Sequence, residues 1–399
     1  MPCVSQSINS VSMHIIEVAD KSSWRLFHQA PHLVYKNEPH WIAPLESDVE
    51  KIFRPDTNKA MQNGAAKLFV LLDDQGTPVG RIAAFVDHQR NLQQTFPQGG
   101  IGFFECVNNK DYARALFEKA EAFLVNEKVK AIDGPVNFGE RDKFWGLLVK
   151  GQEYSPLYQE NYHPTYYKAF FEENGYEPYE QILTLKGTVN DIPLDRIRSI
   201  AKRLRERYGL TTRSIEKSKL EWYADLFRQV YNEAFREYPH FKPLHTAQVY
   251  EGMKQARPIL DPNLVCFAFE KDQPIGFLAL LPDINQFLQP AKGKLDWLRL
   301  PGFLWRFKTA KQWVAKGIAS AIHPDFQRKG IFPLIVDHLA MPANLKKYSH
   351  IYLATIRSHN QLMVETAVNL GVKPDRVHVA YRKMLDKSIP LDPYMFMDV

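Results

Sequence analysis

The residues best placed to do chemistry lie where an apolar strand passes through a short polar loop into an apolar helix. The run Ser320–Phe332 reads Ser-Ala-Ile-His-Pro-Asp-Phe-Gln-Arg-Lys-Gly-Ile-Phe. A helix that starts directly after such a loop offers free backbone N–H groups and the positive end of its dipole to an anion. Gly330 has no side chain to keep a phosphate from the backbone, and Arg328 and Lys329 add positive charge. The pattern therefore predicts a phosphate-binding loop.

The spacing of this run resembles motif A of the GNAT acyltransferase superfamily. Ile322, Pro324, Gln327, Gly330 and Phe332 give apolar-x-Pro-x-x-Gln-x-x-Gly-x-Phe. In that family the loop binds the pyrophosphate of acyl-coenzyme A. The resemblance implies acetyl-CoA or another acyl-CoA as co-substrate, no metal, and a binding site made of Ala321, Ile322, Gln327, Arg328, Lys329, Gly330, Ile331, Phe332 and Asn360.

The segments that follow the loop keep the family's order. An apolar strand at 351–355 comes first, and Asn360 then opens a helix that ends at Leu370-Gly371. Asn360 is expected to cap this helix, to contact the pantetheine arm, or to do both. The resemblance implies N-acyl transfer, most simply of acetyl, to an amine on a small molecule or peptide. The amine would attack the thioester directly, with strand amides near Ala321 and Ile322 polarising the carbonyl.

Three residues depart from the family pattern or leave the chemistry open. Phe332 stands where Gly or Ala is usual, and Ala367 stands where a Tyr often protonates the leaving thiolate. His323 is a candidate general base because its usual pKa lies near neutrality, although a His-Pro pair can also simply end a strand. A non-catalytic acyl-CoA sensor is therefore the alternative function.

An internal repeat organises the chain. Pro78 and Gly80 lie in a strand-turn-strand pattern that Pro274 and Gly276 repeat 196 residues later. Two helices that stop at a glycine, Gly175 and Gly371, are also 196 residues apart. One offset shared by separate landmarks indicates duplication, and chance similarity of common patterns is the alternative.

Strands alternate with helices in both halves, which predicts an α/β fold with a mixed sheet in each. We expect two GNAT-like domains in tandem, 1–190 and 191–399. The first has no glycine in its corresponding loop, 106–113, and Phe171 at the Tyr-equivalent position. It is expected to be a degenerate copy that shapes the substrate groove. Segments 134–137, 146–151 and 162–167 resemble a group of uncharacterised tandem bacterial GNAT-like proteins. The tyrosines of 154–167 could line a pocket or belong to the core.

Composition excludes several classes of protein. The chain has 399 residues, 45% apolar and 24% charged, which is typical of a globular protein and not of a disordered or fibrous one. A net charge of +6 is too small to predict nucleic-acid binding. Three cysteines at no useful spacing predict reduced thiols and a cytoplasmic location. No signal peptide or apolar run of about 18 residues is present, so no transmembrane segment is expected. The sequence does not indicate the oligomeric state.

The segment 283–316 is both basic and aromatic. Seven lysines and arginines against two aspartates give it a net charge of +5, interleaved with several Trp, Phe and Leu residues. It could be a lid, a contact for an anionic or acylated substrate, or a membrane- or nucleic-acid-binding patch. The alternative that we favour from the sequence is an amphipathic helix whose apolar face covers a core.

Overall fold

The computed structural model describes residues 13–188, 190–237, 241 and 243–398, which form two compact units. The first unit comprises residues up to Ile182 together with 288–301 and 377–398, and the second comprises 183–287 and 302–376. The predicted division at residue 190 did not include this exchange, in which a C-terminal segment packs with the first half. No helix among the described residues is long and apolar enough to span a bilayer.

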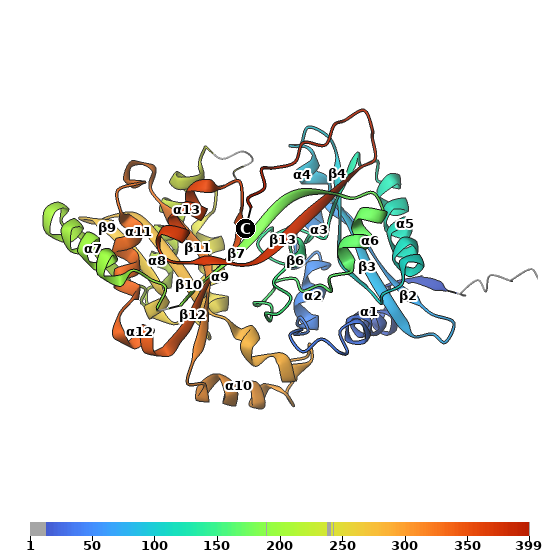
Figure 1. The fold of residues 1–399 in the computed structure, drawn as a ribbon, viewed down its shortest axis with the longest axis horizontal. Coiled ribbons are helices and arrows are strands. Elements are labelled where there is room, and N and C mark those ends of the chain that lie inside the picture. Colours follow the sequence, from blue (N-terminus) through green and yellow to red (C-terminus); the bar gives the residue numbers. More distant parts are fainter. Residues whose placement is uncertain (1–12, 189, 238–240, 242, 399) are drawn as a thin grey trace, which may run out of the picture. The chain divides into compact units, whose positions relative to one another are not determined.

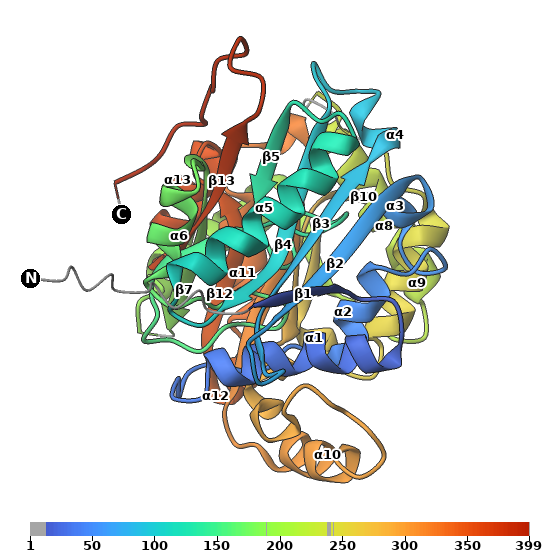
Figure 2. The ribbon, with the colours of Figure 1, turned by 90° about the vertical axis from the view of Figure 1, so that its right-hand side faces the viewer.

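The first unit is a mixed sheet with helices against it (Figures 1 and 2). Its strands are β1 (His14–Glu17), β2 (Gly64–Leu72), β3 (Pro78–Asp87), β4 (Gln98–Cys106), β5 (Ala131–Gly134) and β6 (Leu147–Lys150). Its helices are α1 (Lys21–Val34), α2 (Glu46–Ile52), α3 (Lys59–Gln62), α4 (His88–Asn91), α5 (Lys110–Asn126) and α6 (Tyr167–Glu173). The strand order is β1-β2-β3-β4-β5-β13, and β6 also pairs with β13 (Lys373–Met384).

The second unit repeats this plan. Its elements are α7 (Leu194–Tyr208), β8 (Leu210–Ser214), α8 (Leu220–Phe235), α9 (Thr246–Ala256), β9 (Val265–Glu270), β10 (Gln273–Pro282), β11 (Trp313–Ile322), α11 (Ile331–Leu339), α12 (Pro342–Lys347), β12 (Tyr348–Arg357) and α13 (Gln361–Asn369). The strand order is β8-β9-β10-β11-β12-β7, where β7 is Glu177–Thr188. A further helix, α10 (Leu300–Thr309), precedes β11.

The two sheets share their pairing pattern. In the first unit β2, β3 and β4 pair antiparallel, and β4 and β5 then pair in parallel. In the second unit β9, β10 and β11 pair antiparallel, and β11 and β12 pair in parallel. A parallel pair requires a crossover, and α5 and α11 supply it in the respective units. The duplication inferred from the sequence is thus matched by a repeated topology.

The glycines that marked the repeat have matching physical roles. A Cβ on Gly80 would lie 2.8 Å from Leu116 Cδ1 of α5, and one on Gly276 would lie 3.1 Å from Ile331 Cγ2 of α11. Each glycine therefore lets the crossover helix lie close against the sheet. Gly175 and Gly371 have φ of +80° and +91° and end α6 and α13 in the left-handed conformation that favours glycine.

Side chains alternate between the two faces of β10 and so place the helices around the second sheet. Gly276 faces α11, whereas Phe277 packs with Phe267 and with Tyr223 and Leu226 of α8. Helices α8 and α11 therefore cover opposite faces of the sheet. In the first unit, Phe27 of α1 packs with Ala83 and Phe85, on the face opposite α5.

The structure describes two of the three cysteines that were predicted to be reduced thiols. Cys106 and Cys266 are buried and free, and Cys3 lies outside the described residues. The cytoplasmic location stays a prediction. Within the described ranges there is no group of three or more potential metal ligands.

The tyrosine-rich stretch 154–167 belongs to the core of the first unit at its most buried positions. Tyr167 is fully buried, and its hydroxyl donates to Glu105 Oε2 at 3.0 Å. The Tyr35 hydroxyl donates to the same carboxylate oxygen at 2.6 Å. Burial outweighs these contacts and raises the pKa of Glu105 to about 6. Of the two readings of this stretch, the structure therefore favours the core for Tyr167.

Candidate functional site

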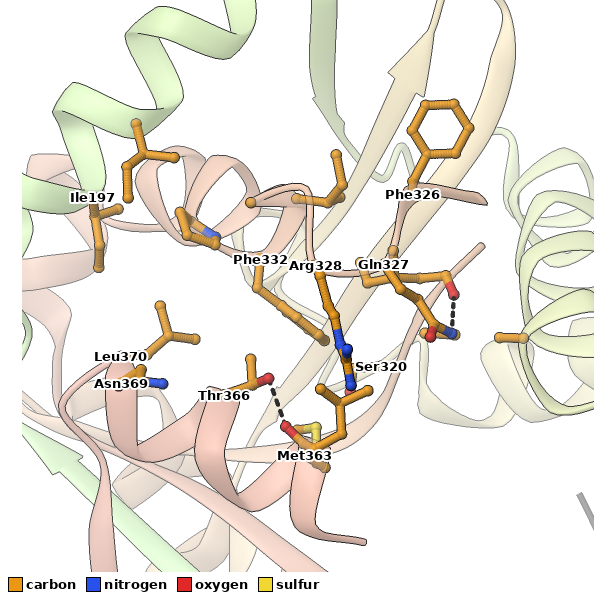
Figure 3. A pocket seen from close by; sticks show the side chains of 18 of the residues that line it. Ile197, Ser320, Phe326, Gln327, Arg328, Phe332, Met363, Thr366, Asn369 and Leu370 are labelled. Atoms are coloured by element: carbon orange, nitrogen blue, oxygen red, sulfur yellow. Dashed lines mark hydrogen bonds between the residues drawn. The ribbon is translucent and has the colours of Figure 1, made fainter. Parts of the chain in front are cut away.

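A pocket of about 400 Å³ surrounds the start of α11 in the second unit. Its walls come from the end of β11, the loop after it, and helices α7, α8, α11 and α13. In Figure 3 the side chains of Arg328 and Phe332 reach into it toward Met363. The sequence-predicted residues that line it are Ala321, Ile322, Gln327, Arg328, Gly330, Ile331, Phe332 and Asn360.

Two predicted residues do not line the pocket. The Lys329 ammonium lies 5.3 Å from the centre of the Phe326 ring. His323 is mostly buried, and its Nδ1 accepts a hydrogen bond from the Asp325 amide at 3.3 Å, which caps a short 3-10 turn, Pro324–Phe326. The geometry thus favours a structural role for His323 over that of a general base.

The start of α11 has no side-chain cap. Gly330 is its N-cap, with a φ of +83° that favours glycine. Four backbone N–H groups of this turn meet no acceptor within the described part of the chain: those of Arg328, Gly330, Ile331 and Phe332. Unpaired amides that face a pocket at a helix N-terminus form an anion-binding cradle. The Phe332 ring is half-buried and itself lines the pocket.

The charge of the pocket matches an anion. Arg196 of α7 and Arg328 of the loop are the charged residues among its described lining, which contains no carboxylate. Ile197 and Ile200 of α7 add an apolar wall. A Cβ on Gly330 would lie 3.2 Å from Ile200 Cγ2, so α7 also packs against the loop from behind.

Strands β11 and β12 pair only over the first part of their lengths. Their parallel register ends at Gly317 and Leu353, although β11 continues to Ile322 and β12 to Arg357. An extra residue, Ile318, bulges from β11 at this point, and β11 pairs with β10 as far as Ile322. A bulge bends its strand and ends regular pairing. The last five residues of β11 therefore have no strand partner on the β12 side and can bind an extended ligand.

Asn360 is at the N-cap of α13, where its side chain accepts from the Met363 amide at 3.3 Å. It also lines the pocket, so the structure is compatible with both roles expected from the sequence. Ala367 is fully buried in the same helix. No His, Tyr, Cys, Lys, Asp or Glu appears among the described residues that line the pocket.

The corresponding loop of the first unit has its polar groups satisfied internally. The Asn109 side chain accepts from the amides of Asp111 and Tyr112 at the start of α5. The Cys106 amide donates to the Tyr167 hydroxyl at 2.7 Å, and the Tyr166 hydroxyl donates to the Cys106 carbonyl. These contacts give a physical reason for the expectation that this half does not bind coenzyme A.

Sequence reasoning missed the contribution of α7, α8 and the far end of α13. The lining residues that were not predicted are Pro193, Arg196, Ile197, Ile200, Ala234, Phe235, Ser320, Phe326, Pro333, Leu362, Met363, Thr366, Asn369 and Leu370. The signal that could have found α7 is the basic character of residues 194–208.

A second cavity, of about 80 Å³, lies in the same unit on the α11 face of the sheet. Its lining is almost wholly apolar and includes Leu280 and Leu353. A Cβ on Gly317 would lie 3.6 Å and 3.0 Å from the Cδ2 atoms of these two leucines. The cavity therefore borders the point at which β11 and β12 separate. Leu370 lines both this cavity and the larger pocket.

Comparison with known proteins finds two similar sequences of nearly the same length. The chain is 25% identical to a protein named bacterial ceramide synthase from Caulobacter vibrioides, over 94% of this chain and 98% of that protein. It is 22% identical to protein YghO of Escherichia coli K12, over 92% and 94%. No family model matches the chain.

Solved structures show similarity of fold. A tandem GNAT protein from the clavulanic acid biosynthesis pathway has a TM-score of 0.53 at 11% identity, with 96% of this chain and all of that chain covered. A GCN5-related glucosamine N-acetyltransferase region of a fungal multi-domain protein has a TM-score of 0.56 at 13% identity. That comparison covers 96% of this chain, which spans only 39% of the fungal protein.

Proposed function

We propose that this chain, which has the tandem GNAT fold, transfers an acyl group from acyl-coenzyme A to an amine. The observation that carries the proposal is the uncapped start of α11, whose free amides face a pocket containing two arginines and no carboxylate. A diphosphate satisfies both the amides and the positive charge. The fold alone does not define the activity, so the proposal depends on this site.

The chain's own residues divide the binding of acyl-CoA among them. The amides of residues 328–332, together with Arg196 and Arg328, would hold the diphosphate. Asn360 and the unpaired edge of β11 would hold the pantetheine arm, and amides near Ala321 and Ile322 would polarise the thioester carbonyl. The thioester supplies an activated acyl group.

The proposed amine acceptor attacks through its nitrogen, which is nucleophilic once it has lost a proton. The new C–N bond forms as the C–S bond of the thioester breaks, and the amine proton passes to solvent or to the departing thiolate. The described pocket lining offers no side chain of suitable pKa for this transfer. Orientation of the two reactants is therefore expected to supply most of the rate enhancement.

An acyl chain longer than acetyl is favoured by the apolar cavity beside Gly317. A ceramide is the amide of a fatty acid with a long-chain amino alcohol, so the name of the Caulobacter protein agrees with this choice. Each buried methylene contributes about 0.8 kcal/mol. We therefore expect hexanoyl-CoA to bind more than about tenfold more tightly than acetyl-CoA in isothermal titration, because its added methylenes enter the cavity. Equal affinities would leave acetyl as the acyl group.

Acyl-CoA binding without transfer is the second candidate. It is favoured by Ala367, which is buried at the position where the family often has a tyrosine, and by the lack of a titratable acid or base in the described lining. The distinguishing experiment measures thiol release from acetyl-, hexanoyl- and palmitoyl-CoA with a panel of alkylamines and amino alcohols. Amide formation, identified by mass spectrometry, supports transfer. Tight binding with no thiol released by any amine supports a sensor.

Charge reversal on α7 tests the anion site. Arg196 lines the pocket, whereas the exposed Arg198, two residues away on the same helix, does not. The Arg196→Glu variant should bind coenzyme A about tenfold more weakly, because a carboxylate replaces a charged partner of the diphosphate. Arg198→Glu makes the same change in net charge and should bind almost normally. Equal weakening in both variants would indicate a general effect of charge and not a contact.

A further inference from the structure

Five large apolar side chains are exposed within nine residues, in the segment that joins β10 to β11. Trp297 is 79% exposed, and Trp305 and Leu298 are each 66% exposed. Leu304 and Leu300 are 42% and 40% exposed. The sequence favoured an amphipathic helix that covers a core with its apolar face. That expectation is wrong for these side chains, which stay exposed. Large apolar side chains exposed close together along a chain usually mark an interaction site.

The segment is held in place by other residues, so this exposure belongs to the folded protein. Phe303 and Phe307, one turn apart on α10, pack against Phe287 and Trp313 with ring centres 4.6–6.4 Å apart. Helix α10, drawn in orange in Figure 2, thus docks through its two phenylalanines. Leu300, Leu304 and Trp305 point elsewhere and remain exposed.

Basic residues alternate along the chain with the exposed apolar side chains. Two of the basic residues are paired, Lys294 with Glu46 and Arg299 with Asp296. Arg306, Lys308 and Lys311 form no ion pair with any described carboxylate. The segment 292–311, here called the basic-aromatic segment, therefore carries unpaired positive charge within a few residues of its exposed Trp and Leu side chains.

This combination is best matched by the surface of a bilayer that contains anionic phospholipids. Indole rings partition to the boundary between headgroups and acyl chains, and lysine and arginine reach the phosphates from there. Protein interfaces are depleted in lysine, and a second copy would bring like charges together. Binding to the phosphate backbone of nucleic acid would use the cations but would leave most of the exposed Trp and Leu surface in water. We propose that the basic-aromatic segment attaches this protein to anionic membrane surfaces, with Trp297 and Trp305 inserted at the headgroup level.

The test compares sedimentation of the full-length protein with vesicles of phosphatidylcholine alone and of phosphatidylcholine mixed with phosphatidylglycerol. The wild type should bind the anionic vesicles and shift its tryptophan fluorescence to shorter wavelength, and binding should weaken as salt is raised. A Trp297→Ser/Trp305→Ser variant should partition at least about tenfold less. Leu92→Ser, at a residue 81% exposed in the first unit, is the matched control and should bind like the wild type.

A second variant, Lys308→Glu/Lys311→Glu, keeps both tryptophans and should lose the preference for anionic vesicles. Wild-type protein that ignores both vesicle types would overturn the proposal, as would unchanged binding in both double variants. Ultracentrifugation tests whether the segment instead forms a dimer interface. A dimer that the tryptophan substitutions abolish, in a protein that does not bind vesicles, would assign the segment to self-association. Acyl transfer is assayed separately and does not depend on this result.

Discussion

Replacing Gly330 with aspartate should weaken the binding of coenzyme A about 100-fold, which corresponds to about 2.7 kcal/mol. The added carboxylate would stand at the N-cap of α11, beside the amides that we expect to hold the diphosphate, and would repel that anion at short range. A Cβ at this position would also press on Ile200 Cγ2 at 3.2 Å. Isothermal titration with coenzyme A measures the loss.

Gly209→Asp is the matched control for this variant. Gly209 caps the C-terminal end of α7 with a φ of +64°. An aspartate there carries a backbone strain similar to that at Gly330, about 1–2 kcal/mol, and the same charge. A Cβ on Gly209 would meet nothing within 4 Å, and the residue does not line the pocket. Both variants should unfold at lower temperature than the wild type, but only Gly330→Asp should lose affinity. Normal affinity in Gly330→Asp would contradict the proposed site and the transferase with it.

The anion loop could be predicted from sequence because its geometry is local. A strand that ends at Ile322, a polar turn and a helix that starts after Gly330 leave amides unpaired whatever surrounds them. The repeat was predictable for a related reason, since Gly80 and Gly276 each meet a close steric demand from a crossover helix. Residues fixed by short-range constraints leave recognisable spacings in the sequence.

The rest of the site depends on contacts between segments far apart in the chain. Arg196 comes more than a hundred residues before the loop, and its place in the pocket follows from the packing of α7 against α11. The bulge at Ile318 has no sequence signature, although it ends the pairing of β11 with β12. The exchange of residues 377–398 into the first unit has no sequence signature either. The apolar pattern of a buried strand is the same whichever sheet the strand joins.

The exposed tryptophans show that sequence alone does not predict which apolar side chains of one segment are buried. The alternation of Phe, Leu and Trp in 297–307 predicts one buried apolar face, and Phe303 and Phe307 do form one. Hydrophobicity alone could not separate these two from Trp297 and Trp305, because the choice depends on whether Phe287 and Trp313 offer enough surface to cover all of them. Burial of an apolar side chain is thus a property of its partners as much as of its own type.

His163 should make the first unit sensitive to acid. It is only 4% exposed, and burial, helped by the neighbouring His378, lowers its pKa from 6.5 to about 3. Its Nδ1 accepts from the Leu148 amide at 3.1 Å, which requires the unprotonated nitrogen. Below pH 6.5 the unfolded chain binds a proton that the folded chain does not, so stability falls with pH. The loss from this residue should reach about 2 kcal/mol at pH 5 and be absent above neutrality.

A His163→Asn variant separates this effect from general acid unfolding, because an asparagine oxygen can accept from the Leu148 amide but does not titrate. Urea unfolding between pH 5 and pH 7.5 should show a smaller decline for the variant than for the wild type, even if the variant is less stable overall. His14→Asn removes an exposed imidazole from β1 and should keep the wild-type slope. An unchanged slope in His163→Asn would mean that the buried imidazole is protonated in the folded chain, at the cost of its bond to Leu148. The decline in stability would then come from another buried group. Glu105 is not that group, because its raised pKa favours the folded state as pH falls toward 4.5.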